Sequence, residues 1–230
     1  MAQFHAQSCL LCHDSTSKKA VCPACLNDLL QSALDAAYVC PICAHTGDGV
    51  SPCSACQKQP PPFDRLWASV YYEPPISGIL HEFKHNRQLS LAHTLAELMI
   101  ATPPPWLLDV PIDGVLAMPL SHERRLMRGF NQSDELAHLL AQHYGWQLLP
   151  RDTVLRRPTP PQSTLAGHER QHNVAGIFSV ARDVKKCNLL LIDDVCTTGA
   201  TLAEISRMLK LVGVSCLSCW TLARTKMQKN

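Results

Sequence analysis

Two adjacent carboxylates, followed by a short loop of small and hydroxyl residues, are the groups in this sequence best suited to chemistry. Asp193 and Asp194 come directly after the apolar run Leu189–Ile192, which predicts a short buried strand. Residues 197–201 follow and lead into an apolar-periodic run that predicts a helix. The N-terminus of a helix offers unpaired N–H groups to a phosphate, and carboxylates accept hydrogen bonds from sugar hydroxyls. The stretch therefore predicts a site for a ribose 5-phosphate.

The loop after the acidic pair has the composition of a phosphate-binding turn. Its threonine hydroxyls can donate to phosphate oxygens, and its glycine lets the backbone approach a ligand closely. The alternative is a strand that ends in two aspartates without any ligand, with Thr198 serving only to cap the helix. Cys196 lies inside the loop region, and we interpret it as a tolerated small residue because no sequence neighbour would activate its thiol. The loop residues are Thr197, Thr198, Gly199, Ala200 and Thr201.

Cysteine is abundant, with 12 residues in a chain of 230. Eight of them form two successive CxxC-x9-CxxC units, each spanning 17 positions. One CxxC pair presents two thiolates to a tetrahedral ion, so two pairs complete a four-thiolate site. The pattern predicts two structural zinc sites of the zinc-ribbon type; pairing by adjacency is simplest, although the spacing equally allows crossed or nested pairing. The predicted ligands are Cys9, Cys12, Cys22 and Cys25 in the first unit, and Cys40, Cys43, Cys53 and Cys56 in the second.

Two other uses of CxxC pairs, thioredoxin-like redox motifs and iron–sulfur ligation, are disfavoured because four repeated pairs occur without a βαβ context. His13 and His45 each follow a pair closely, and we interpret both as bystanders. Between residues 9 and 56 two lysines face four aspartates, and eight thiolates around two zinc ions add further negative charge. Such a surface binds nucleic acid poorly. We expect the module to dock against the rest of the chain or against a protein partner.

The overall composition excludes several classes of protein. The net charge of +2 is too small to indicate a nucleic-acid partner by itself, and a hydrophobic content of 46% suffices for a substantial core. No run of about 18 apolar residues is present, so no transmembrane helix is predicted. The first ten residues lack the basic and apolar regions of a secretory signal, so we expect a cytoplasmic location. There, paired cysteines hold metal more often than they form disulfides.

A basic segment between a strand and a helix is a second candidate for anion binding. Residues Asp113–Leu120 predict a buried strand, Ser121–Gln132 a basic loop, and Ser133–Tyr144 a helix that ends before Gly145. Arginine binds pyrophosphate through paired hydrogen bonds, although an ordinary solvated basic loop is the alternative. The candidate residues are Arg124, Arg125 and Arg128.

A long stretch without regular pattern, Arg156–Phe178, follows this helix. Loops of such length within a compact domain are usually functional or mobile, and this one could close over a bound substrate. Its most plausible polar contributors are Gln162, Arg170 and Asn173.

The remaining segments complete an alternation of strands and helices. The proline-rich connector Lys58–Pro62 predicts a boundary between a double zinc-ribbon module, residues 1–59, and a second domain, residues 63–230. Lys84, on one of the predicted helices, could face a ligand, although a solvated lysine is commoner. Cys216 and Cys219 resemble a fifth CxxC pair, but in a strand they point to opposite faces, so we exclude them as ligands. We predict helices at Leu26–Tyr38, Gly78–Asn86 and Leu89–Ile100, and strands at Arg65–Tyr72 and Val214–Leu222.

Taken in order, the motifs resemble those of the competence protein ComF family, also known through the gluconate-linked protein GntX. The resemblance covers nearly the whole chain. It rests on the four CxxC pairs, MPL…RRLMRGFNQS at 118–133, Q…L…R..NV.G.F at 162–178, and IDDVCTTGAT at 192–201. At Cys196 the family more often has an aliphatic residue. The resemblance implies an α/β domain of the type I phosphoribosyltransferase kind, with a mainly parallel sheet flanked by helices, joined to the N-terminal zinc-binding module.

The resemblance also implies a ligand, phosphoribosyl pyrophosphate (PRPP) with magnesium, and a role in DNA uptake during natural transformation. In that reading Asp193 and Asp194 hold the ribose, residues 197–201 hold the 5-phosphate, and the Arg124–Arg128 segment holds the pyrophosphate. The resemblance does not determine whether the chain catalyses phosphoribosyl transfer, or to which acceptor. A phosphoribosyltransferase, a non-catalytic PRPP sensor, and a factor that handles single-stranded DNA or meets DNA-uptake proteins are the alternatives. The oligomeric state is not predicted.

Overall fold

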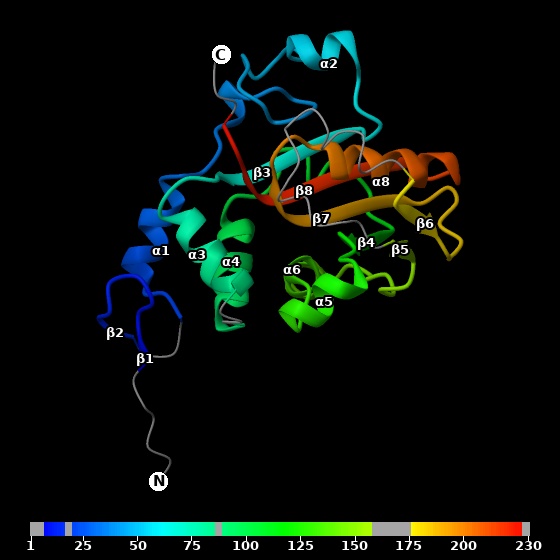
Figure 1. The fold of residues 1–230 in the computed structure, drawn as a ribbon. Coiled ribbons are helices and arrows are strands. Elements are labelled where there is room, and N and C mark those ends of the chain that lie inside the picture. Colours follow the sequence, from blue (N-terminus) through cyan, green and yellow to red (C-terminus); the bar gives the residue numbers. More distant parts are fainter. Residues whose placement is uncertain (1–6, 17–19, 86–88, 158–175, 227–230) are drawn as a thin grey trace, which may run out of the picture.

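The computed structural model describes residues 7–16, 20–85, 89–157 and 176–226. Its centre is a four-stranded sheet in the order β3-β8-β7-β4, in which all neighbouring strands are parallel (Figure 1). Helices cover both faces of this sheet. The predicted class, a mainly parallel sheet flanked by helices with a small N-terminal cysteine module, is therefore confirmed. The strands are β3 (Arg65–Tyr71), β4 (Gly114–Ala117), β7 (Asn188–Cys196) and β8 (Cys216–Arg224).

The run Leu189–Ile192 of β7 is apolar because both faces of the strand are buried there. Along β7, Leu190 and Ile192 belong to one hydrophobic core, and Leu189 and Leu191 belong to the other. The first core includes residues of α3 (Ile76–His85), α4 (Ser90–Ala101) and α6 (Gln132–Tyr144), and the second includes residues of α8 (Ala200–Leu211). These four helices correspond to helices predicted from the hydrophobic pattern. The helix α6 ends, as predicted, at Gly145, which has a φ of 72°.

The basic segment differs from the prediction. We expected a loop over Ser121–Gln132, but the structure contains a helix there, α5 (His122–Arg128). The side chain of Ser121 accepts a hydrogen bond from the N–H of Arg124, and Gly129 ends the helix with a φ of 80°. A cap at each end explains why so short a basic segment is helical.

The long irregular stretch is bounded by a two-stranded antiparallel ribbon, β5 (Val154–Arg156) and β6 (Phe178–Val180). The candidate residues Gln162, Arg170 and Asn173 lie outside the described residues.

The N-terminal module contains five short elements. They are β1 (Gln7–Ser8), β2 (Ser15–Thr16), α1 (Pro23–Leu30), the 3-10 helix η1 (Ala36–Tyr38) and α2 (Ser54–Lys58). The predicted helix Leu26–Tyr38 was wrong in its bounds, because α1 ends at Leu30 and the next residues pair with a strand. The N–H of Leu34 donates to Ser69 O (3.0 Å), and the N–H of Tyr71 donates to Ser32 O (2.9 Å). These bonds cover the edge strand β3, which would otherwise expose unpaired backbone groups.

The two cysteine units pack on opposite sides of the sheet (Figure 1). Cys9 and Leu29 of the first unit's region belong to the core that contains α3, α4 and α6. Cys40, Cys43 and Cys56 belong to the core that contains α8. The expected docking against the rest of the chain is therefore confirmed, while the domain boundary between residues 59 and 63 stays a prediction.

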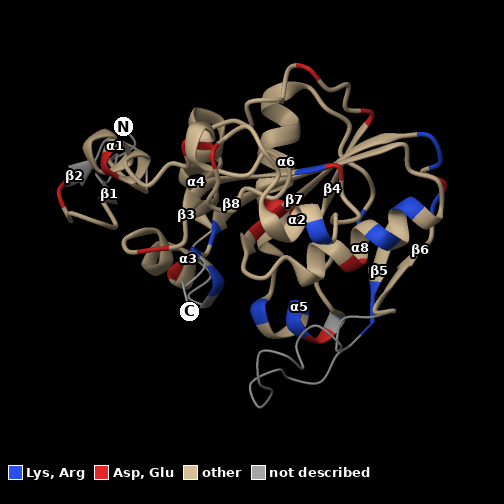
Figure 2. Cartoon of the chain, turned by 90° about the horizontal axis from the view of Figure 1, so that it is seen from above, with Lys and Arg blue, Asp and Glu red and all other residues tan. Residues whose placement is uncertain are grey.

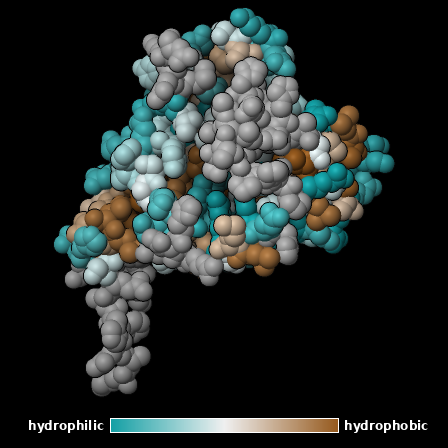
Figure 3. All heavy atoms as spheres, viewed as in Figure 1, coloured by the Kyte–Doolittle hydropathy of each residue, from teal (hydrophilic) through white to brown (hydrophobic). Residues whose placement is uncertain are grey.

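The last strand, β8, holds the two cysteines that we excluded as metal ligands. Cys219 is fully buried in the core, as expected, whereas Cys216 is only half-buried. Among the described residues, no helix is long and apolar enough to cross a membrane. The face shown in Figure 3 carries its hydrophobic residues as separate patches among hydrophilic ones.

Candidate functional site

A cavity of about 190 Å³ lies at the carboxyl ends of β4 and β7. Ligands of open α/β sheets bind at this edge of the sheet. The cavity brings together most of the residues predicted for the site, from two segments far apart in the sequence. It is lined by Arg124, Arg128, Asp193, Asp194, Thr197, Thr198, Gly199, Ala200 and Thr201. Arg125 does not line it and instead lies 3.2 Å from Asp134, beside a neighbouring cavity of about 480 Å³.

The acidic pair is held by contacts from two other elements. The strand β7 continues through both aspartates, so their positions are set by the sheet rather than by a loop. Asp193 Oδ1 accepts hydrogen bonds from Ser133 Oγ (3.0 Å) and from the N–H of Asp194 (2.8 Å). Asp194 Oδ2 forms an ion pair with Lys84 Nζ at 2.9 Å. Residues of α3 and α6 therefore position the pair.

The environment of Asp193 favours its protonated form. Burial, and next the charge of Asp194, raise the pKa of this carboxyl to about 7; the hydrogen bonds from Asp194 and Ser133 and the charge of Lys84 oppose the rise. Two neighbouring carboxylates in a partly enclosed site repel each other unless a proton or a cation lies between them. The pair is therefore suited to a ligand that brings hydroxyl donors or a divalent cation.

Because its pKa is raised, the ionised form of Asp193 lowers the free energy of unfolding of the protein. Folding raises the pKa of this carboxyl from 3.8 to about 7. The free energy of unfolding of the protein therefore falls by on the order of 4 kcal/mol as the pH rises from about 4 to about 7. Asp193→Asn removes the charge but keeps an oxygen that accepts from Ser133. We expect the variant to melt several degrees above the parent chain at pH 8 and the gain to shrink at pH 5. An equal gain at both pH values in thermal unfolding would contradict this interpretation.

The residue 197–201 loop joins β7 to α8 and opens the N-terminus of that helix toward the cavity. Gly199 adopts a φ of 79° and is the N-cap of α8, without a side-chain hydrogen bond to the helix. A left-handed glycine here lets the backbone turn sharply, which a residue with a Cβ would oppose. Thr198 Oγ1 accepts the N–H of Ala200 at 3.3 Å, so the capping role we considered for Thr198 is present at that one donor. The loop has the geometry of an anion site at a helix N-terminus.

Basic side chains face the acidic pair across the cavity. Figure 2 shows positively charged residues on α5, and all of them are arginines. The guanidinium of Arg128 donates to Gln132 Oε1 at 3.1 Å, and Gln132 Nε2 is buried without a hydrogen-bond partner. Burial lowers the pKa of Arg128, with the charge of Arg124 acting in the same direction and that of Asp194 against it. A half-buried guanidinium and an unpartnered amide donor together favour an anionic ligand.

The cavity is also lined by residues that were not among the predicted site residues, and four of these have charged or polar side chains that contribute to the site. Lys84, for which we considered a ligand-facing position, pairs with Asp194, and Ser133 donates to Asp193. Gln132 contributes its amide, and Arg156 reaches Pro119 O (3.4 Å) while its Nε has no partner. Ser133 and Gln132 stand at the start of a helix that follows a basic segment, and this signal could have indicated them. The pairing of Lys84 with Asp194 spans 110 positions and has no local signal.

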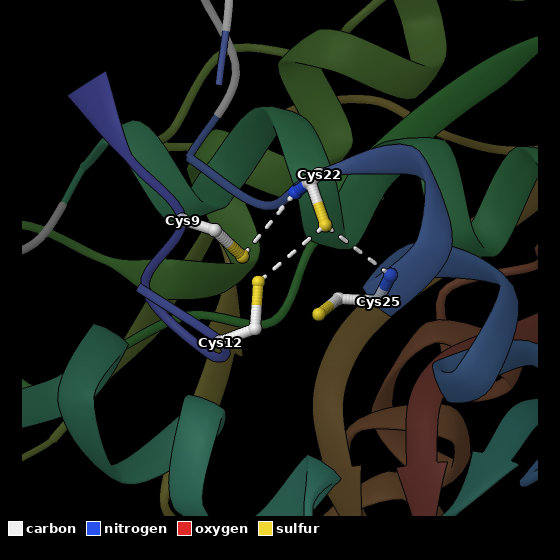
Figure 4. Close-up of side chains that lie close together, drawn as sticks. All are labelled: Cys9, Cys12, Cys22 and Cys25. Carbon is white, nitrogen blue, oxygen red and sulfur yellow. Dashed lines mark hydrogen bonds between the residues drawn. The ribbon is translucent and has the colours of Figure 1, made fainter. Parts of the chain in front are cut away.

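The eight paired cysteines form two separate clusters, and within each cluster all four sulfurs lie within 4.8 Å of one another. The adjacent pairing of CxxC units is therefore the one adopted. Figure 4 shows the side chains of the first unit converging on a common centre. The Cys12–Cys22 and Cys43–Cys53 sulfurs are 3.8 and 3.6 Å apart. Sulfurs about 2.3 Å from a tetrahedral zinc ion are separated by about 3.8 Å, so both clusters fit zinc.

Backbone amides surround one sulfur in each cluster. The N–H groups of Leu11 and Cys22 donate to Cys9 Sγ, and the N–H of Cys53 donates to Cys40 Sγ. Burial opposes ionisation, but the backbone donors outweigh it and lower the pKa of Cys9 to about 6 and that of Cys40 to about 7. The backbone donors thus favour the thiolate, the form that binds metal, at one sulfur in each cluster.

Neither histidine that follows a CxxC pair belongs to a cluster, as expected. His13 is exposed. His45 contacts the guanidinium of Arg224, and burial, followed by the charge of that arginine, lowers the pKa of the imidazole to about 4. The ring is therefore neutral at pH 7 and can accept a hydrogen bond from Arg224.

Comparison with known proteins gave relatives along almost the full length of the chain. No family model matches. The chain is 32% identical over 228 residues to DNA utilization protein YhgH of Salmonella typhi, covering 94% of this chain and 96% of that protein. It is 29% identical over 240 residues to competence protein F of Haemophilus influenzae, covering 97% of this chain and all of that protein.

Among solved structures, a hypoxanthine-guanine phosphoribosyltransferase from Bacillus anthracis matches with 13% identity and a TM-score of 0.33, over 64% of this chain and 76% of that one. That score is too low to support an argument about this chain, whereas the full-length sequence relatives do support one. The level of identity and its extent lead to one conclusion. The chain belongs to the family that includes DNA utilization protein YhgH and competence protein F.

Proposed function

We propose that the cavity at the ends of β4 and β7 binds PRPP. The observation that carries the proposal is the meeting, in one cavity, of an acidic pair, a loop at a helix N-terminus and a basic helix. Asp193 and Asp194 accept from the ribose hydroxyls, and the residue 197–201 loop receives the 5-phosphate. Arg124 and Arg128 of α5 face the pyrophosphate. Each chemical part of the ligand thus meets groups of complementary charge or hydrogen-bonding character.

Magnesium fits the same donor set. Hard oxygen donors suit Mg²⁺, which binds through one or two carboxylates together with substrate phosphates. Asp193 and Asp194 supply those carboxylates, and Lys84 and Ser133 hold them in place. Bound magnesium would be held by Asp193 and Asp194 and would neutralise part of the negative charge of the pyrophosphate. The chain's own contribution is to orient the sugar, to cradle the two phosphate ends and to limit water around them.

The chemistry that such a site supports is transfer of the ribose 5-phosphate to a nucleophile. Pyrophosphate would leave the anomeric carbon through a transition state with oxocarbenium character, and the arginines would stabilise the charge that develops on the leaving group. The acceptor decides whether this chain is a transferase or a PRPP sensor. Binding of PRPP is common to both alternatives and is therefore the core of the proposal.

The names of the relatives suggest the process that this site serves. Those proteins are named for DNA utilization and for competence. We propose that PRPP binding in this chain contributes to the handling of DNA or its components. Direct binding of single-stranded DNA is the competing candidate. It would show a steep decline with salt, because phosphate contacts release counterions, and it would survive loss of the acidic pair.

The experiment that tests the proposal combines binding with product detection. Thermal unfolding is measured with and without magnesium and PRPP, since a ligand at 100 times its Kd raises the free energy of unfolding by about 2.7 kcal/mol. Phosphorus NMR then follows pyrophosphate release with nucleobases or single-stranded DNA added. Stabilisation with acceptor-dependent release identifies a transferase, and stabilisation with no release from any acceptor identifies a sensor. No stabilisation at millimolar PRPP would reject the proposal.

A further inference from the structure

A buried arginine at the end of β8 lies between the second cysteine unit and the residue 197–201 loop. Arg224 is only 2% exposed. Its Nε donates to His45 Nδ1 (3.4 Å), a second guanidinium nitrogen contacts His45 Nε2, and a third donates to Cys196 Sγ (3.2 Å). Within the described part of the chain, no carboxylate forms an ion pair with it. The guanidinium therefore bridges an imidazole and a thiol that belong to different parts of the molecule.

One end of this bridge is fixed by the second cysteine unit. His45 follows Cys43 by two positions, and its carbonyl accepts the N–H of Cys40 at 2.6 Å. The backbone of His45 is thus part of the turn that holds two of the four sulfurs. If the sulfurs separate, the imidazole that meets Arg224 loses its support.

The other end of the bridge lies against the loop. Cys196 is the last residue of β7 before the loop, and its sulfur lies 3.8 Å from the position that a Cβ at Gly199 would occupy. The residue after Arg224 adds two more contacts, because Thr225 donates its N–H to Cys196 O (3.2 Å) and its hydroxyl to Thr197 O (3.5 Å). The end of β8 therefore contacts both Cys196, which precedes the loop, and Thr197, its first residue.

We propose that Arg224 is a positioning residue that couples the second cysteine unit to the residue 197–201 loop, so that metal in that unit keeps the loop in its binding conformation. This inference rests on the proposed function of the loop. The coupling is specific to one unit. The first unit packs on the other side of the sheet, against the core of α3, α4 and α6, and no contact described here joins it to the loop.

Charge gives a further reason for the coupling. A buried guanidinium without an anionic partner is costly, and breaking its remaining hydrogen bonds leaves it uncompensated. Four thiolates around one divalent ion carry a net charge of about −2. A loaded second unit places this negative charge two positions before His45 in the sequence. The metal thus stabilises the buried cation as well as the turn that supports His45.

The test uses variants of His45, because loss of Arg224 from the core could unfold the chain. His45→Ala removes the acceptor that Arg224 uses, and His45→Gln restores an acceptor oxygen. His13→Ala is the matched control, since it follows a CxxC pair of the first unit but is exposed. Zinc content and overall melting are checked first. Amide hydrogen exchange is then measured in residues 197–201 and in the β7 core, without ligand, followed by titration with magnesium and PRPP.

We expect His45→Ala to speed exchange of the loop amides about tenfold and to weaken PRPP binding by about the same factor, which is within the range that mutations of coupling residues produce. Exchange at Leu190–Ile192 should not change, and His45→Gln and His13→Ala should behave like the parent chain. Unaltered loop exchange and binding in a folded, metal-loaded His45→Ala protein would overturn the inference. If the parent chain itself does not bind PRPP, the proposed function fails, while the exchange experiment still tests the coupling.

Discussion

Replacing Asp193 and Asp194 together with asparagine should reduce PRPP binding at least 100-fold. The pair loses both negative charges, so the charge-assisted hydrogen bonds to the ribose hydroxyls become weaker neutral ones and the anionic ligands for magnesium are lost. Lost hydrogen bonds to charged groups cost about 1.5–3 kcal/mol each, and two such losses amount to a factor of roughly 100 or more. Calorimetric titration of the folded double variant with magnesium and PRPP measures the effect.

The fold should survive this change. Asparagine at position 193 still offers an oxygen to Ser133 Oγ, and removal of the buried charge relieves the repulsion between the two carboxylates. The matched control is Asp109→Asn, an exposed aspartate remote from the cavity, which should bind like the parent chain. Undiminished PRPP binding by a double variant that keeps its zinc would contradict the assignment of this site to PRPP.

Loss of metal should have the second large effect, on stability. We expect about two zinc ions per purified chain, one for each cluster of four thiolates. Structural zinc contributes roughly 10–16 kcal/mol of apparent binding energy at pH 7, which matches or exceeds the total stability of most domains. Cys43→Ser should leave about one zinc ion and lower the melting temperature sharply, because its cluster shares a core with α8.

Cys216→Ser is the matched control for this experiment. Cys216 also stands in a CxxC pair, with Cys219, but neither belongs to a metal cluster. Since Cys216 is only half-buried, its replacement should leave two zinc ions and nearly the same melting temperature. Metal analysis that finds iron, or no metal in a fully folded chain, would contradict the zinc-ribbon interpretation.

The sequence predicted those parts of the structure that have a local signal. The apolar run before Asp193 became the central strand β7, and the helix after the loop became α8. The spacing of the CxxC pairs predicted both clusters, since two thiolates in one tight turn can serve only a nearby ion. It could not select among pairing schemes, because that choice depends on the path of the chain between the pairs.

Contacts between distant segments had no such signal. The segment after α1 was predicted to be helical, but its backbone forms hydrogen bonds with β3 instead. These bonds depend on an edge strand about 35 positions away. The caps at Ser121 and Gly129 made α5 a helix although its charges suggested a loop. Lys84, Ser133 and Arg224 reach the site region from three different elements, so only the folded chain shows what they contact.

The measurement that tests the central claim most directly is calorimetric titration of the parent chain with magnesium and PRPP, with pyrophosphate and ribose 5-phosphate as separate ligands. The account predicts one PRPP per chain, bound more tightly than either fragment, because the loop and the basic helix each hold one end of the ligand. Binding that requires magnesium would support the role given to Asp193 and Asp194. If a chain that holds its zinc shows no heat of binding with millimolar PRPP, the proposal that the cavity binds PRPP is contradicted.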